Sequence, residues 1–299
     1  MLSVTVALMY FKGLHYFYEV AKRGSFTLAA EQLHIAQPAV SMAVKKLEQS
    51  LELTLFHRVE RQISLTDEGQ RLYRQAERIL QAVADAELEM RELRGLERGS
   101  VQLGTPSMLG SYHFPSIIMA FRRRYPNLTF TVHEGGAWQL QTMLERGELD
   151  LAVIEAEAVP DTIQAVPLLR EEMRVVVNAA HPFAGQGSVT PQAFLGEDLV
   201  LFREGYFHRK VINQMAEQYG IAPKINFETN LLPLIRSIVK QGSGISTLLT
   251  MATEDDPDLI TLSFNPPVML DLCLAWRKDG YLSKANRAFV DFVLESSRL

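Results

Sequence analysis

The chain has 299 residues, of which 47% are hydrophobic and 22% charged, a balance typical of soluble globular proteins. This length is sufficient for two or three domains, and no apolar run reaches the roughly 18 residues that would span a bilayer. The formal net charge of −5 argues against general coating of nucleic acid, but it leaves room for a local site.

The N-terminal segment MLSVTVALMYF is apolar but lacks the basic start and small-residue cleavage site of a signal peptide. We therefore expect a cytoplasmic protein, with Met9 as a candidate alternative start. The single cysteine, Cys273, excludes an internal disulfide and a CxxC metal or redox pair. Because it lies in the apolar run LDLCLAW, we expect a buried structural thiol. No cofactor or metal is expected.

Residues 12–22 place apolar side chains at helical spacing, and Gly24 interrupts the pattern. Ser25 is a suitable N-cap for a second helix, FTLAAEQL, whose small alanines allow another helix to approach closely. The connection HIAQ is about four residues long, as in a helix-turn-helix corner.

A third helix is predicted from Gln37, the expected cap position, with Pro38 in its first turn. Its buried stripe is predicted to be Val40, Val44, Leu47 and Leu51. The opposite face then carries Pro38, Ser41, Met42, Lys45 and Gln49. Such a face either enters a DNA major groove or is the solvated side of a small helical bundle.

The following segment, TLFHRVERQISLT, predicts a short hairpin with Arg58 and Arg61 near its tip. A basic hairpin after a helix-turn-helix is typical of a wing that contacts the sugar-phosphate backbone. Glu60 in the same tip opposes that role.

Residues 9–66 resemble the winged helix-turn-helix of LysR-type transcriptional regulators through the motifs SFT, AA, QPAVS, LE and LF.R. The resemblance implies DNA contacts from the third helix and the wing. The residues expected to bind double-stranded DNA are Ser25, Thr27, Gln37, Pro38, Ala39, Ser41, Met42, Lys45, Lys46, Arg58 and Arg61. Met42 departs from the family pattern, in which a polar or basic residue often stands at this position.

Thr66, followed by two acidic residues, predicts the start of a long helix that Gly95 and Gly99 end. Apolar residues recur along it at alternating spacings of 4 and 3, the pattern of a coiled-coil seam. The predicted dimer seam is Leu72, Ala76, Ile79, Val83, Ala86, Met90 and Leu93. Packing of this helix on its own domain is the alternative.

From Val101 onward, short apolar runs alternate with helical stretches, which predicts βα units and mainly parallel sheets. The expected strands are VQLGTP, LTFTVHE, LDLAVIE, MRVVVNA, DLVLF, KINFETN, ISTLL and LDLCLAW. Placing Tyr125 on Tyr219 without a gap aligns Glu134 with Glu228 and Leu140 with Leu234. This alignment predicts two equivalent half-domains.

Ligands of α/β lobes bind beyond the carboxyl ends of strands, where helix N-termini present free N–H groups. The expected effector-binding residues are Thr105, Ser107, Met108, Gly135, Gly136, Phe202, Arg203, Tyr206, Thr229 and Asn230. Structural roles are open alternatives: Ser107 can cap a helix, Arg203 can pair with Glu204, and His208 can be a solvated helix residue.

The resemblance to LysR-type regulators also implies a two-lobed effector domain, similar to a periplasmic binding protein, with a small-molecule cleft. The predicted architecture is α+β overall. It comprises a winged helix-turn-helix at 9–66, a linker helix at 67–98 and an effector-binding domain at 99–299. Within that domain, lobe I is expected at about 99–166 plus 269–299, and lobe II at about 167–268.

The expected function is transcriptional regulation by a homodimer or homotetramer that binds promoter DNA under the control of a polar or anionic effector. The alternative is a small-molecule-binding protein or an enzyme of the solute-binding fold. We find no HExxH, P-loop, GxSxG or dinucleotide motif, so an enzyme is disfavoured.

Overall fold

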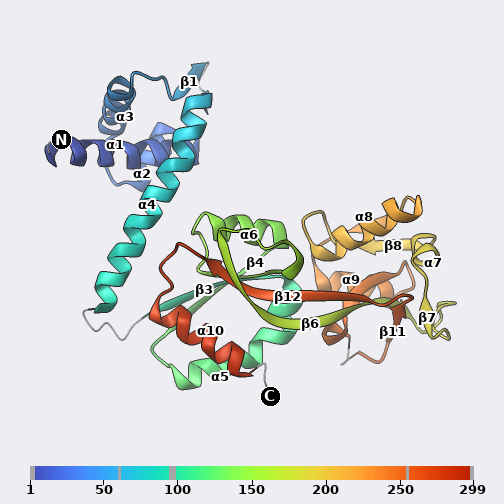
Figure 1. Cartoon of the computed structure of the whole chain (residues 1–299). Helices are drawn as coiled ribbons and strands as arrows, with labels where there is room; N and C mark the ends of the chain where they lie inside the picture. Colours follow the sequence, from blue (N-terminus) through green and yellow to red (C-terminus); the bar gives the residue numbers. More distant parts are fainter. Residues whose placement is uncertain (1–3, 60–61, 94–98, 254–255, 297–299) are drawn as a thin grey trace. The chain divides into compact units, whose positions relative to one another are not determined.

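The computed structural model describes residues 4–59, 62–93, 99–253 and 256–296. The chain forms two compact units, Met1–Leu88 and Glu89–Leu299, which we describe separately. Figure 1 traces their elements along the sequence.

The first unit begins with three helices, α1 (Val4–Arg23), α2 (Phe26–Gln32) and α3 (Gln37–Leu51). As predicted, Ser25 caps α2 by accepting a hydrogen bond from the Leu28 N–H (3.3 Å). The cap of α3 is Ala36 rather than the expected Gln37, and it has no side-chain cap bond. A side-chain acceptor is less necessary here because Pro38, in the first turn, has no N–H to satisfy.

The core of this unit joins α1, α2, α3 and the start of the long helix α4 (Asp67–Leu93) around Phe17, which is fully buried. Val40, Val44 and Leu47 are buried as predicted, whereas Leu51 is 36% exposed. Leu51 ends α3, and the chain turns away at Glu52 in a left-handed conformation (φ 55°).

The predicted hairpin is present as β1 (Phe56–Val59) and β2 (Gln62–Leu65), paired antiparallel. After it, the Thr66 hydroxyl accepts a hydrogen bond from the Gly69 N–H (2.9 Å) and donates one to the Thr54 carbonyl (2.7 Å). A Cβ atom on Gly69 would lie 2.1 Å from the Leu55 carbonyl oxygen, so only glycine fits this close approach.

The predicted apolar seam of α4 divides in two, because Ala76 is fully buried and Leu72 half-buried in the first unit's own core. These two residues follow the alternative interpretation of packing within the chain. Further along, Ile79 (45%), Val83 (37%) and Met90 (51%) are exposed.

The second unit contains an eight-stranded sheet of order β4-β3-β5-β12-β6-β11-β7, with β10 also paired to β6, and a two-stranded sheet of β8 and β9. All eight predicted strands are present. The bounds are β3 Ser100–Thr105, β4 Thr129–Glu134, β5 Leu151–Glu155, β6 Ile163–Asn178, β7 Ser188–Val189, β8 Asp198–Leu201, β9 Lys224–Glu228, β10 Ser246–Leu249, β11 Leu259–Phe264 and β12 Val268–Arg277. The sequence patterns missed β7, β11 and residues 163–172 of β6.

The pairing is mixed rather than mainly parallel. Strand β3 is parallel to β4 and β5, and β8 is parallel to β9. The long strands β6 and β12 run antiparallel to each other (Figure 1). They join lobe I (β3–β5) to lobe II (β7–β11), because the far end of β6 pairs with β10 and β11.

Helices cover both lobes. They are α5 (Phe114–Arg124), α6 (Ala137–Glu145), α7 (Pro191–Leu195), α8 (Phe207–Tyr219), α9 (Leu232–Lys240) and α10 (Lys284–Ser296), with the short η1 (Leu109–His113), η2 (Ala156–Ala158) and η3 (Thr250–Ala252). Strand β5 is buried on both faces: Leu151 and Val153 belong to one apolar cluster with Phe289 of α10, and Ile154 belongs to another with Leu140 of α6.

The predicted repeat has the expected element order, with β4-α6-β5 in lobe I and β9-α9-β10 in lobe II. Glu134 and Glu228 both end their strands. The helices differ in register, since Leu140 is buried and its aligned partner Leu234 is 45% exposed.

Candidate nucleic-acid interface and ligand sites

The outward face of α3 carries most of the predicted DNA-binding residues. Gln37, Pro38, Ala39, Met42, Lys45 and Lys46 are exposed, and Ser41 is half-buried. They lie on the exposed face of the N-terminal half of α3. The opposite face is buried, with Val40 and Val44 fully inaccessible to solvent. A helix presented in this way has the width and polarity to enter a major groove.

The remaining predicted DNA-binding residues differ in exposure and in hydrogen bonding. Thr27 is exposed, whereas the Ser25 hydroxyl already caps α2. The backbone of Arg58 pairs with Ile63 in the hairpin. The Arg58 side chain and all of Arg61 lie outside the described residues.

Met42 borders an apolar groove between α1 and α3, with a volume of about 270 Å³. Its lining residues are Lys12, Gly13, Tyr16, Ile35, Ala39, Met42, Ala43, Lys46, Leu47 and Ser50. The Lys12 ammonium lies 5.7 Å from the centre of the Tyr16 ring. Lys12 therefore adds a positive charge beside α3 that the motif analysis did not include.

In the second unit, the structure brings predicted effector residues of both lobes together. The Tyr206 hydroxyl of lobe II donates a hydrogen bond to the Glu134 carboxylate of lobe I (2.6 Å). A Cβ atom on Gly136 would lie 2.4 Å from the carbonyl oxygen of Gly205, so the two lobes touch at backbone level. The absence of a side chain at Gly136 therefore lets the backbone of lobe II approach lobe I closely.

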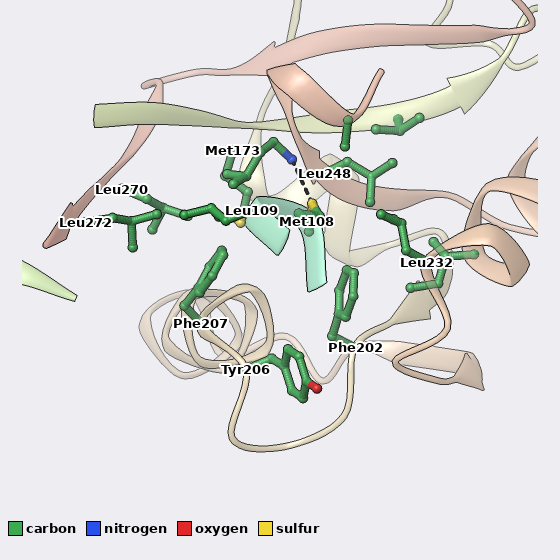
Figure 2. Close-up of a cluster of buried hydrophobic side chains, with 14 of the residues drawn as sticks. Met108, Leu109, Met173, Phe202, Tyr206, Phe207, Leu232, Leu248, Leu270 and Leu272 are labelled. Atoms are coloured by element: carbon green, nitrogen blue, oxygen red, sulfur yellow. Dashed lines mark hydrogen bonds between the residues drawn. The ribbon is translucent and has the colours of Figure 1, made fainter. Parts of the chain in front are cut away.

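Behind this contact lies an apolar interlobe cluster (Figure 2). The labelled side chains are Met108, Leu109, Met173, Phe202, Tyr206, Phe207, Leu232, Leu248, Leu270 and Leu272. Met108 is 2% exposed, and its sulfur accepts a hydrogen bond from the Leu249 N–H (3.5 Å). Of the predicted effector residues, Met108, Phe202 and Tyr206 thus pack in this core.

Some of the predicted polar effector residues already have hydrogen-bond partners within the chain. The buried Thr105 hydroxyl donates to the Pro106 carbonyl (3.3 Å), whereas Ser107 is half-buried. The Arg203 N–H donates to the Asn230 side-chain oxygen (3.0 Å), and the Thr229 hydroxyl accepts from the Leu231 N–H (3.1 Å). The Arg203 side chain is exposed. Glu204, considered as its partner, pairs instead with Arg209 (3.2 Å).

His208 is buried rather than solvated, which corrects the sequence-based interpretation. Its ring lies 5.0 Å from that of Phe202 and 4.3 Å from that of Phe207, because the first turn of α8 enters the interlobe cluster. Burial lowers the pKa of His208 to about 3, so the ring is neutral at physiological pH. Burial, and secondarily Glu134, raises the pKa of Tyr206.

Two further polar contacts cross between the lobes. Lys210 of α8 pairs with Glu155 at the end of β5 (2.5 Å). Arg236 of α9 hydrogen-bonds to the Tyr112 hydroxyl of η1 and to Asp256 (2.5 Å). The sequence analysis identified neither contact, because no local pattern links residues so far apart in the chain.

A surface groove, which we call the hinge groove, lies beside β6 and β12 and has a volume of about 460 Å³. It is lined by Ala156, Glu157, Pro167, Leu168, Leu169, Arg170, Asp271, Leu272 and Cys273. Cys273 is 7% exposed, and burial raises the pKa of its thiol, in agreement with the predicted structural role.

Among the described residues, no helix is both long and apolar enough to span a bilayer. In the same part of the chain, no group of three or more His, Cys, Asp or Glu side chains is arranged to hold a metal ion.

Comparison with known proteins places these sites in a family. Residues 11–70 match the model of the bacterial regulatory helix-turn-helix protein, lysR family, and residues 94–298 match that of the LysR substrate binding domain. The uncharacterized HTH-type transcriptional regulator YcgK of Bacillus subtilis is 31% identical over 95% of this chain and 94% of its own length. A probable RuBisCO transcriptional regulator of Trichormus variabilis is 28% identical over 92% and 85%.

Solved structures of related regulators have a similar fold. A full-length OxyR variant from Pseudomonas aeruginosa superimposes with a TM-score of 0.69 at 26% identity, covering 97% of this chain and 94% of that one. The effector binding domain of QuiR in complex with shikimate gives a TM-score of 0.59 at 25% identity, covering 67% and 98%. The chain belongs to the LysR family of transcriptional regulators, with a helix-turn-helix DNA-binding domain followed by an effector-binding domain.

Proposed function

We propose that the chain binds promoter DNA through the exposed face of α3 and the β1–β2 wing, and that a small-molecule effector in the second unit controls this binding. The domains are then 9–66 for DNA binding, 67–98 for the linker helix, and 99–299 for the effector. The observation that carries the proposal is the division of α3 into a buried apolar face and an exposed face with Lys45, Lys46 and Met42.

The roles on α3 follow from side-chain chemistry. Gln37 and Ser41 can read base edges, Lys45 and Lys46 can bind phosphate or guanine, and Met42 can contact a thymine methyl group. Outside α3, Thr27, Arg58 and Arg61 are proposed backbone contacts.

The salt dependence of DNA binding tests this assignment. Removing one lysine that binds a phosphate lowers the slope of log K against log salt by about 0.9, so Lys45→Ala should reduce the slope by about that amount. The measurement is fluorescence anisotropy on a fragment from beside the chain's own gene. Arg74→Ala, on the exposed surface of α4, is the matched control and should leave the slope unchanged. Absence of salt-sensitive, sequence-selective binding by the wild type would exclude the proposed function.

We place the effector between the lobes, where Ser107, Arg203, Thr229 and Asn230 retain exposed or half-buried polar groups. These donors suit a polar or anionic ligand, and shikimate is the ligand in the related QuiR domain. The lobes are closed by the Tyr206–Glu134 hydrogen bond and the Lys210–Glu155 pair. An effector that binds one degree of closure better than another would shift the balance between them.

We infer that the chain self-associates through the exposed part of α4, as a homodimer that can form a tetramer. The proposed seam retains Ile79, Val83, Ala86, Met90 and Leu93, of which the Leu93 side chain lies outside the described residues. Two chains would present two recognition helices to two half-sites. The protein then acts by binding rather than by catalysis, in the cytoplasm where bacterial DNA lies.

A further inference from the structure

The hinge groove lies at an irregularity in the strands that join the lobes. Leu272 of β12 is in register with Leu169 of β6, but the next residue, Cys273, is in register with Pro167. Leu168 is therefore a bulged residue with no counterpart on β12. Bulges interrupt the regular ladder and often occur beside functional sites.

The floor of the hinge groove is apolar and its size suits a small molecule. Among its lining residues, Leu168 (5%), Leu272 (2%) and Cys273 (7%) are buried. Its volume of about 460 Å³ lies within the range of ligand pockets, roughly 300–1,000 Å³. A single aromatic or aliphatic ring can therefore cover this floor.

The rim of the hinge groove is acidic. Arg170 and Asp271 form an exposed ion pair (3.5 Å), so the Arg170 charge offsets one carboxylate. Glu157, another lining residue, is also exposed and leaves one negative charge in excess. Charge complementarity at this rim favours a cationic group over a carboxylate.

We propose that the hinge groove is a second ligand site, which binds a small, mainly apolar molecule that carries a primary amine. It shares no residue with the predicted effector set between the lobes. Its wall at Ala156 follows Glu155, which is bonded to Lys210 of lobe II. Leu272 belongs both to this groove and to the interlobe cluster (Figure 2). A ligand here would bias lobe closure, a consequence that rests on the proposed function.

Cys273 allows a direct test, because it is the only cysteine in the chain and lines the groove. The full chain is incubated with either of two disulfide probes, a phenyl ring bearing an aminomethyl group or the same ring bearing a carboxylate. The Cys273 thiolate displaces 2-mercaptoethanol from the probe, forming a mixed disulfide that intact-protein mass spectrometry measures. We expect about fivefold more capture of the aminomethyl probe, the upper range for an exposed charge pair.

Glu157→Gln should reduce that preference towards equal capture, while the fold is unchanged because Glu157 is exposed. The control is Cys273→Ser combined with Gln214→Cys, which places an exposed thiol on α8 outside the groove and should capture both probes equally. Equal capture of the two probes by wild-type Cys273, or a preference for the carboxylate, would overturn the proposal. DNA binding does not enter the readout, so failure here is distinct from failure of the proposed regulatory function.

Discussion

At the residue scale, the first turn of α8 shows how tertiary packing replaces a local pattern. Phe207, His208 and Arg209 are all buried, although helical periodicity alternates buried and exposed sides. They are buried because this turn enters the interlobe cluster, so that three successive side chains meet protein and only Lys210 is exposed. Arg209 is compensated there by Glu204 and Glu228 (both 3.2 Å), whereas His208 is held neutral.

The buried His208 should make stability depend on pH. Its folded-state pKa of about 3 lies below the ordinary value of 6.5, so below pH 6.5 the unfolded chain gains a proton that the folded chain excludes. The stability that depends on neutral His208 is therefore fully present above pH 6.5 and decreases as the pH falls towards 3. Between about pH 7.5 and about pH 5, His208 should lower the free energy of unfolding of the wild type by about 2 kcal/mol. In the His208→Phe variant this part of the decrease should be absent, as measured by urea denaturation. An identical pH dependence in both proteins would contradict this prediction.

At the element scale, apolar periodicity predicted α3, α4 and eight strands, because each must bury one face or two against neighbours. The α6 and α9 helices show where this reasoning fails. The ungapped alignment pairs Leu140 with Leu234, yet the buried residue of α9 that corresponds to Leu140 is its neighbour, Ile235. One extra residue between β9 and α9 rotates the helix by about 100°, and a sequence offset of one residue is invisible to strand patterns.

The apolar stripe of helix α4 is buried at Ala76 and exposed at Val83, and a substitution tests whether the exposed part is the proposed dimer seam. Val83→Asp introduces a charge into the exposed part of the stripe, beyond the core formed with Ala76. If Val83 lies in a dimer seam, burial of this charge should weaken self-association at least about tenfold, measured by light scattering across a dilution series.

Ala84→Asp is the matched control for Val83→Asp, since Ala84 is the next residue along α4 and is also exposed but lies outside the stripe. It should leave association unchanged. Equal effects of the two substitutions would assign Val83 to an ordinary solvated surface, and the seam would have to lie elsewhere.

At the scale of the whole molecule, the family and the two-lobed domain could be predicted, because they rest on motifs and on element order. The contacts that close the lobes could not. Glu134 and Tyr206 meet only because β6 and β12 set the distance between two half-domains. The structure brings Tyr206 against Glu134 and Gly136 against Gly205, whereas Met108 and Phe202 are buried packing residues. The hinge groove depends on a one-residue bulge, which no apolar pattern encodes.

The Tyr206–Glu134 hydrogen bond is the closing contact most readily tested on the intact protein. A hydrogen bond to a charged group contributes about 1.5–3 kcal/mol, so Tyr206→Phe should favour lobe opening by about tenfold or more. Amide hydrogen exchange at Gly136 and Gly205, which lie at the lobe contact, should accelerate accordingly. Tyr219→Phe, at the far end of the same helix, controls for loss of a hydroxyl from α8. Unchanged exchange in the Tyr206 variant would mean that the remaining contacts, apolar packing and the Lys210–Glu155 and Arg236–Tyr112 interactions, hold the lobes together without this hydrogen bond.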